Sequence, residues 1–168
     1  ATHIYLLVSP ISKPIMKSRL RPATPTDSPK LAQISMLAGG GTFELLLKNM
    51  KNGVNPEQVL SKLSSRDNNE YSYKFFTVAE IDGEDAGGVN AISKEDRYKY
   101  AANINPVMKS EFGFGIIQLI KFYIRARHLK GMNVLNVPKN SLHVNDIAVL
   151  PDFQGKGIGG ELMQHVIR

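Results

Sequence analysis

The 168-residue sequence contains no cysteine. Disulfide bonds, a thiolate nucleophile and cysteine-ligated zinc are therefore excluded. The four histidines stand at positions 3, 128, 143 and 165, which lack the local spacing of a histidine-built metal site. We therefore expect chemistry that uses neither a thiol nor a metal ion.

The sequence also lacks a long hydrophobic segment that would indicate targeting or membrane insertion. Its apolar run Ile4–Val8 is too short for the hydrophobic region of a signal peptide or for a membrane span. Internal repeats and low-complexity tracts are absent as well. We therefore expect a cytoplasmic protein that has no membrane partner.

The composition is that of a folded domain with a basic surface. Hydrophobic residues make up 42% and charged residues 21%, which argues against a wholly disordered chain. The formal charge of +6 suits a polyanionic cofactor, a nucleic acid or an anionic membrane. The sequence shows no strand with interleaved aromatic and basic residues and no recognisable helix-turn-helix, so we expect no nucleic-acid partner.

The order of hydrophobic patterns predicts an α/β domain. Strands are expected at residues 2–8, 19–23, 73–81, 86–92 and 142–150. Helices are expected at residues 29–38, 43–50, 56–63, 106–128 and 157–168. The Asp82-Gly83 turn predicts that the third and fourth strands form a hairpin.

The longest predicted helix is Pro106–His128, which follows a polar segment, Ser93–Asn105, that we expect to be irregular. Ile116, Ile120 and Ile124 share one face of this helix, and we expect that face to pack in the core. A lid over a ligand cleft is the alternative interpretation of the same helix. In that case Tyr98, Tyr100, Phe112 and Phe114 could line the cleft, although we expect most of them to pack in the core.

Glycine is concentrated between the last predicted strand and the last predicted helix, at positions 155, 157, 159 and 160. Glycine allows the backbone to approach a ligand closely, and the following helix places its positive dipole end there. Such a loop is typical of a phosphate or pyrophosphate site. Lys156 would add a cation at its rim.

Two familiar phosphate motifs fit this loop poorly. A Walker A loop requires Ser or Thr after Gly-Lys, but Gly157 follows Lys156. A dinucleotide fingerprint matches Gly155, Gly157 and Gly160, yet it calls for an acidic residue about 20 positions later, beyond the end of the sequence. An acetyl-CoA loop is the third interpretation.

The segment IAVLPDFQGKGIG, residues 147–159, resembles the cofactor signature of the GNAT family of N-acetyltransferases. That signature reads Arg/Gln-x-x-Gly-x-Gly/Ala, and Gln154, Gly157 and Gly159 stand at its defining positions. The strand before it and the helix after it are where the family has them. The segment SRLRPATPTD, residues 18–27, also resembles the family's first strand and its turn into the first helix.

The resemblance implies a mixed, largely antiparallel central sheet flanked by helices. The acetyltransferase domain would span 18–168 after an N-terminal extension, 1–17, and would carry a helical insertion at about 96–140. The implied reaction moves an acetyl group from acetyl-CoA to the primary amine of a small molecule or peptide, by direct attack in a ternary complex. A non-catalytic module that binds CoA or another nucleotide is the alternative.

The resemblance also assigns roles to individual residues. The expected cofactor contacts are Ile147, Ala148, Val149, Gln154, Gly155, Lys156, Gly157, Ile158, Gly159 and Gly160. The backbones of Ile147 and Val149 would pair with the pantetheine arm, and the N–H groups of the glycine loop would hold the pyrophosphate. Gln154 would orient the mouth of that loop.

His143 is the candidate general base, because an imidazole of ordinary pKa near 6.5 suits that role. Some family members carry a catalytic carboxylate at this place. Strand alternation puts His143, Asn145 and Ile147 on one face and Asp146 on the other. We expect Asp146 to form only a local hydrogen bond.

The resemblance covers the first two-thirds of such a domain, and the family's next strand, helix and two strands have no counterpart in the sequence. We therefore expect an open edge on the 142–150 strand and incomplete cover over Ile158, Leu162 and Val166. Part of the missing strand-helix-strand-strand unit could be supplied in three ways: by a longer natural chain, by a second subunit in a homodimer, or by the strand at 2–8. We favour the longer chain.

Overall fold

The computed structural model describes residues 17–50, 53–130, 138 and 141–168, so the strand expected at 2–8 lies outside the described residues. The four described strands form one antiparallel sheet in the order β1-β2-β3-β4. They are β1 (Arg19–Pro22), β2 (Phe76–Ile81), β3 (Glu84–Ser93) and β4 (Leu142–Val149). This is the antiparallel sheet that the sequence predicts.

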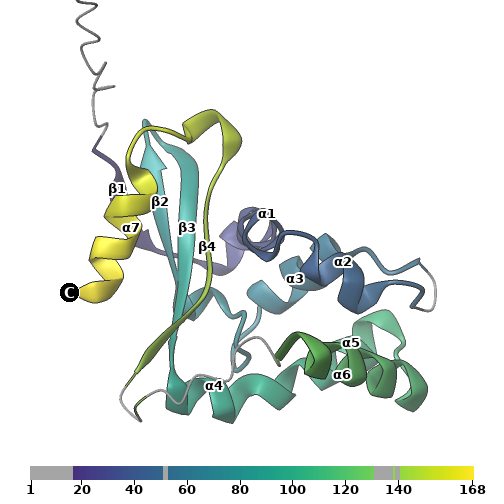
Figure 1. The fold of residues 1–168 in the computed structure, drawn as a ribbon. Coiled ribbons are helices and arrows are strands. Elements are labelled where there is room, and N and C mark those ends of the chain that lie inside the picture. Colours follow the sequence, from purple (N-terminus) through teal and green to yellow (C-terminus); the bar gives the residue numbers. More distant parts are fainter. Residues whose placement is uncertain (1–16, 51–52, 131–137, 139–140) are drawn as a thin grey trace, which may run out of the picture.

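Helices cover both faces of the sheet. The α-helices are α1 (Ser28–Gly39), α2 (Thr42–Leu47), α3 (Pro56–Ser64), α4 (Lys94–Tyr100), α5 (Ile104–Phe112), α6 (Ile116–Lys130) and α7 (Ile158–Ile167). Short 3-10 helices are η1 (Pro25–Asp27), η3 (Tyr73–Phe75), η4 (Ala101–Asn103) and η5 (Pro151–Phe153). Figure 1 shows α7 alone on one face, whereas α1, α2, α3, α5 and α6 lie on the other side.

An arginine cluster joins the first strand to the first helix and to the β2–β3 hairpin. The guanidinium of Arg21 donates to Asp27 at 2.8 and 3.1 Å, to Glu80 at 3.0 Å and to Asp85 at 2.7 Å. Hydrogen bonds from Arg21 and from Thr24 hold the pKa of Asp27 below its usual range. The cluster therefore sets the direction in which α1 leaves β1.

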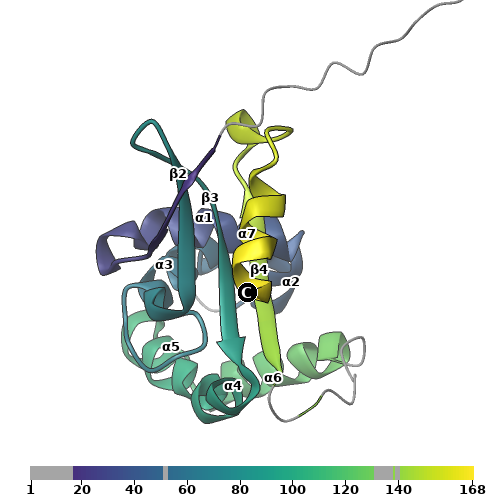
Figure 2. The same ribbon diagram turned by 90° about the vertical axis from the view of Figure 1, so that its left-hand side faces the viewer.

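The helix α7 packs against the sheet through Ile158, Leu162 and Val166 (Figure 2). Ile158 and Leu162 are fully buried, in contact with a cluster from β2 and β3. The expectation that this face lacks cover is therefore wrong for these two residues. The backbone N–H and the hydroxyl of Ser18 both donate to Glu161, which joins the start of β1 to the same helix.

The segment between β3 and β4 is helical from its start, so the expected irregular stretch at 93–105 is wrong. The hydroxyl of Ser93 accepts a hydrogen bond from the N–H of Asp96 at 3.0 Å and donates to its carboxylate at 2.9 Å. This reciprocal cap starts α4. The single long helix expected at 106–128 is also wrong, because Gly113 takes a left-handed φ of 64° and separates α5 from α6.

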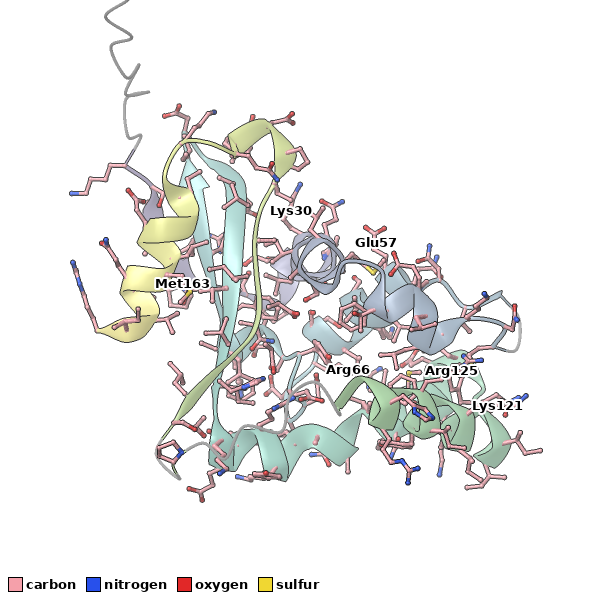
Figure 3. All side chains as sticks on the ribbon, viewed as in Figure 1. Lys30, Glu57, Arg66, Lys121, Arg125 and Met163 are labelled. Carbon is pink, nitrogen blue, oxygen red and sulfur yellow. The ribbon has the colours of Figure 1, made fainter. Side chains whose placement is uncertain are left out.

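The face of α6 that packs inward is not the isoleucine face. Ile116, Ile120 and Ile124 are 68%, 52% and 52% exposed, and the core contacts instead come from Leu119, Phe122 and Ala126. Arg125, which lies between α6 and α2 in Figure 3, explains this rotation. Its guanidinium donates to the carbonyls of Leu46 at 2.9 Å and Lys48 at 2.6 Å, at the end of α2.

Within the described ranges, no helix is both long and apolar enough to cross a membrane.

Candidate active site

The strand β4 presents one backbone edge to β3 and the other away from the sheet. The N–H of Leu150 donates to the carbonyl of Ala86 at 2.8 Å. Backbone groups alternate between the two edges of an antiparallel strand, so those of Ala148 and Leu150 face β3. Those of Ile147 and Val149 therefore point to the open edge, because β4 is last in the described sheet.

A glycine permits the close approach of β3 to β4 at this level. A Cβ atom on Gly87 would lie 2.6 Å from the carbonyl oxygen of Ala148 and 3.0 Å from the Cα atom of Val149. Both neighbours are backbone atoms, which cannot turn away as a side chain can. Gly87 therefore positions the end of β4 from which the glycine loop starts.

A β-bulge interrupts β4 at the centre of the candidate site. Asn90 of β3 pairs with Asp146 and Ala91 pairs with Val144, so Asn145 is an extra residue on β4. Such a residue is unpaired in the ladder, and it changes which side chains share a face. The strict alternation predicted from the sequence therefore fails here.

The bulge brings His143, Asn145 and Asp146 to the wall of one cavity. Ile147, which alternation placed beside His143 and Asn145, packs instead against the α7 cluster on the opposite face. The cavity has a volume of about 480 Å³. Its other walls come from the end of α1, from α2 and α3, and from the α4–α6 region.

Asp146 is buried and has a long-range partner, so the expectation of a local hydrogen bond is wrong. The hydroxyl of Ser35, on α1, donates to its carboxylate at 2.7 Å. Burial raises the pKa of Asp146, the Ser35 hydrogen bond lowers it, and the charge of Glu70 raises it, so that the pKa is about 6 instead of the ordinary 3.8. The carboxyl group thus titrates close to neutral pH.

Three more polar side chains surround Asp146 and His143 at this end of the cavity. Arg97, on α4, forms an ion pair with the carboxylate of Glu70 at 3.5 Å. Burial and the charge of Arg97 lower the pKa of His143 below its usual 6.5, which favours the neutral imidazole. Burial, Glu70 and Asp146 raise the pKa of Tyr71 well above its usual range, so its hydroxyl stays protonated.

The glycine loop follows β4 through η5. The side-chain amide of Gln154 donates to the carbonyl of Val149 at 3.0 Å and so ties the loop back to the end of the strand. Gly155 and Gly157 take left-handed φ values of 76° and 87°, which only glycine adopts at little cost. The ammonium of Lys156 lies 4.9 Å from the centre of the Phe153 ring.

The start of α7 offers backbone donors beside this loop. The N–H groups of Gly160 and Glu161 bond to the carbonyl of Gly157, and the two earlier N–H groups of the helix lack an intrahelical acceptor. A Cβ atom on Gly159 would meet only one ordinary contact, at 3.8 Å, and one on Gly160 would meet open space. This accessible backbone, with the helix dipole behind it, fits a phosphate-bearing ligand.

Sequence comparison places the chain in a family. A model described as the acetyltransferase (GNAT) family matches residues 43–168, which is well over half of the chain. The chain belongs to the GNAT acetyltransferase family. It is therefore an acyltransferase enzyme, as the resemblance in the glycine loop implies.

Solved structures show the GNAT fold at low sequence identity. The crystal structure of an acetyltransferase matches with 20% identity and a TM-score of 0.65, covering 89% of this chain and 72% of that chain. An N-acetyltransferase from Staphylococcus aureus Mu50 matches with 19% identity and a TM-score of 0.62, covering 89% and 74%. At this identity the likeness concerns the fold. No curated protein sequence matches the chain.

Several groups in this GNAT cavity were missed by sequence reasoning. Glu70 lies in a polar loop without any motif, and Ser35 lies inside a helix, so neither position carries a signal. Arg97 belongs to α4, which the Ser93-x-x-Asp96 capping pattern could have indicated. Asp146 shares its strand with His143 and Asn145, so its burial had no separate signal.

Aromatic residues of the β3–β4 segment meet the expectation in part. Four of them were expected mostly in the core, with the cavity lining as the alternative: Tyr98, Tyr100, Phe112 and Phe114. Phe114 is buried in the core and Phe112 packs against it, whereas Tyr98 is 76% exposed. The aromatic residues of this segment that line the cavity are Phe122 and Tyr123. In the described part of the chain, no cluster of three or more His, Asp or Glu side chains could hold a metal ion.

Proposed function

We propose that this GNAT protein transfers the acetyl group of acetyl-CoA directly to a primary amine in a ternary complex. The observation that carries the proposal is the juxtaposition on β4 of two features. The bulge directs His143, Asn145 and Asp146 into a cavity, and the same strand leads directly into the glycine loop. One strand thus connects a site for an acceptor to a site for an acyl donor.

The donor side would be held mainly by backbone groups. The outward-facing N–H and C=O groups of Ile147 and Val149 are suited to pair with the amide groups of the pantetheine arm, as an added strand would. The loop from Gly155 to Gly160 and the first turn of α7 would hold the pyrophosphate, with Lys156 at the rim. Acetyl-CoA supplies an activated acetyl thioester when it is bound there.

The acceptor side must remove a proton, because an alkylamine arrives as an ammonium ion and attacks only as the neutral amine. His143 is the proposed proton acceptor, since its lowered pKa keeps the imidazole neutral at pH 7. Asp146 and Glu70 would attract the ammonium to the same end of the cavity. An unpaired backbone N–H at the bulge would stabilise the negative charge that develops on the acyl oxygen.

Direct transfer, without an acetylated enzyme, agrees with the sequence. The chain has no cysteine, so a thiolate cannot accept the acetyl group. In the described residues, the cavity wall holds neither a lysine nor a serine that could take its place. We also propose a cytoplasmic location, where acetyl-CoA would be available.

The donor site is tested by calorimetric titration of acetyl-CoA into the wild type and two glycine variants. Gly157→Val should abolish binding, because a β-branched side chain at a φ of 87° distorts the loop and fills space next to it. Gly113→Val is the matched control, since it introduces the same strain at a φ of 64° between α5 and α6. It should retain the wild-type affinity.

Three results of this titration, of the same titration with NAD and of an acetylation assay would count against the proposal. Unchanged affinity in Gly157→Val would contradict the assignment of the donor site to the loop. Tight binding of acetyl-CoA by the wild type, together with no acetylation of any amine, would favour the non-catalytic CoA-binding module instead. NAD that binds more tightly than acetyl-CoA would support the dinucleotide-binding alternative.

A further inference from the structure

The cavity next to β4 has two ends of different chemistry. Its charged lining groups in the described residues are Glu70, Arg97, Asp146 and the titratable His143, and they gather at the β4 end. The remaining walls, from α2, α3, α5 and α6, are mostly hydrocarbon and carry no charged side chain among the described residues, although the hydroxyl groups of Thr42 and Tyr123 belong to them. A ligand that fills the cavity must therefore be polar at one end and apolar over the rest.

The polar end carries more negative than positive charge. Glu70 and Asp146 supply two carboxyl groups, whereas Arg97 is the one permanent cation that the described residues place in the lining, and it is already paired with Glu70 at 3.5 Å. His143 adds no charge when its imidazole is neutral. The complement of this end is a single cationic group, and a ligand carboxylate placed here would face two carboxyl groups.

The apolar end offers no charged partner, within the described residues, to a second charged group. Phe43, Leu46, Leu60, Met108 and Phe122 form most of its walls, and the first four of these are buried in the helical core. The hydroxyl of Tyr123 already donates to Asn105 at 2.9 Å, which leaves Thr42 as the other hydroxyl there. A second ammonium or several hydroxyl groups would lose their hydration there for too few partners, which costs a few kcal/mol per unpaired group. Polyamines and aminoglycosides are therefore poor matches.

We propose that the acetyl acceptor is a monoamine on an apolar body, either aryl or branched alkyl, which enters with its amine toward β4. This inference rests on the proposed function, because it names the substrate class of the same site. The volume of about 480 Å³ lies in the range of small-molecule sites, roughly 300–1,000 Å³. The cavity therefore has room for an aromatic ring together with its aminoalkyl arm.

The test compares three amines as ligands and as substrates of the wild-type protein. Tryptamine is a monoamine on an aromatic body, tryptophan adds a carboxylate to the same body, and spermidine adds further cations to an alkyl chain. We expect kcat/KM for tryptamine to exceed the other two by at least about 10-fold, which is what a fitted apolar pocket discriminates. Calorimetry should show the same order of affinity without acetyl-CoA.

A pair of variants on α6 locates the effect in the cavity. Ala126→Glu places a carboxylate at the apolar end, because Ala126 lines the cavity and is half-buried. It should weaken tryptamine binding at least about 10-fold and improve spermidine binding. Ile120→Glu puts the same charge on the exposed side of the same helix and should change neither affinity.

The outcomes separate this inference from the proposed function. Acetylation of spermidine or tryptophan in preference to tryptamine would overturn the inference and leave the acetyltransferase proposal in place. Selective binding of tryptamine without acetylation of any amine would support the inference and remove the proposed function. Failure of tryptamine to bind and to react would overturn the inference, as would equal effects of Ala126→Glu and Ile120→Glu.

Discussion

The buried carboxyl group of Asp146 makes a measurable prediction about stability and pH. Its pKa is about 6 in the folded protein, against 3.8 for a free side chain. The folded state therefore binds this proton more tightly than the unfolded state does. It follows that the free energy of unfolding decreases as the pH rises from 3.8 to 6.

The pKa difference corresponds to roughly 3 kcal/mol of lost stability once Asp146 is fully ionised. Asp146→Asn has no such titration but keeps an oxygen to accept the Ser35 hydrogen bond. The difference in unfolding free energy, variant minus wild type, should therefore increase with pH. We expect an increase of about 2 kcal/mol between pH 4 and pH 7.

Urea denaturation followed by far-UV circular dichroism measures this difference at each pH, and the absence of tryptophan makes fluorescence less suitable. Other titrating groups are common to both proteins and largely cancel. Ser35→Ala is an informative companion, because it removes the hydrogen bond that lowers the pKa of Asp146. In Ser35→Ala the pKa of Asp146 should be higher than in the wild type, so the free energy of unfolding should keep decreasing up to a higher pH. A difference between Asp146→Asn and wild type that stays constant, or falls as pH rises, would refute this reasoning.

Two other substitutions test the proton acceptor and the close contact of β3 with β4. His143→Ala should lower turnover about 10²–10⁴-fold if His143 is the sole base, and unaltered rates from pH 6 to 9 would reject that role. Gly87→Ala should destabilise the protein by about 1–3 kcal/mol in chemical denaturation, because its Cβ would meet the backbone of Ala148. The control Gly160→Ala should not destabilise the protein, because its Cβ would point into open space. Equal stability of the two variants would contradict the close contact at Gly87.

The glycine loop and the elements on either side of it were predictable because their signals are local. Gln154, the glycines after it and the apolar face of α7 lie within one continuous segment, and the family pattern is read along that segment. The strand-loop-helix order follows from short-range propensity, so β4 and α7 appear within a residue or two of their expected bounds.

The cavity next to β4 was less predictable because it depends on contacts between distant segments. The bulge at Asn145 arises from the pairing of β4 with β3, and the sequence of β4 alone does not predict it. Strand alternation therefore placed Asp146 on the face of β4 opposite His143 and Asn145, whereas all three line the same cavity. The inward face of α6 likewise follows from Arg125, which binds the end of α2 almost eighty positions earlier in the chain.

The helix boundaries within the β3–β4 segment had local sequence signals. The prediction followed the spacing of apolar residues instead of these signals. Gly113 and Gly115 interrupt a run that otherwise continues the helical spacing. Ser93 and Asp96 form a capping pattern in a stretch whose polarity suggested a loop. Because of these two errors, neither Arg97 nor Phe122 was predicted to line the cavity.

Transfer of a labelled acetyl group tests the central claim most directly. Acetyl-CoA carrying a carbon-13 acetyl group is mixed with the protein and a panel of amines that contains tryptamine, tryptophan and spermidine, and the protein and the amines are all examined by mass spectrometry over the first turnovers. The account predicts label on the amine nitrogen, with none on the protein at any time and with free CoA released in equal amount. Label that appears first on the protein, or acetyl-CoA that binds and remains intact, would contradict it.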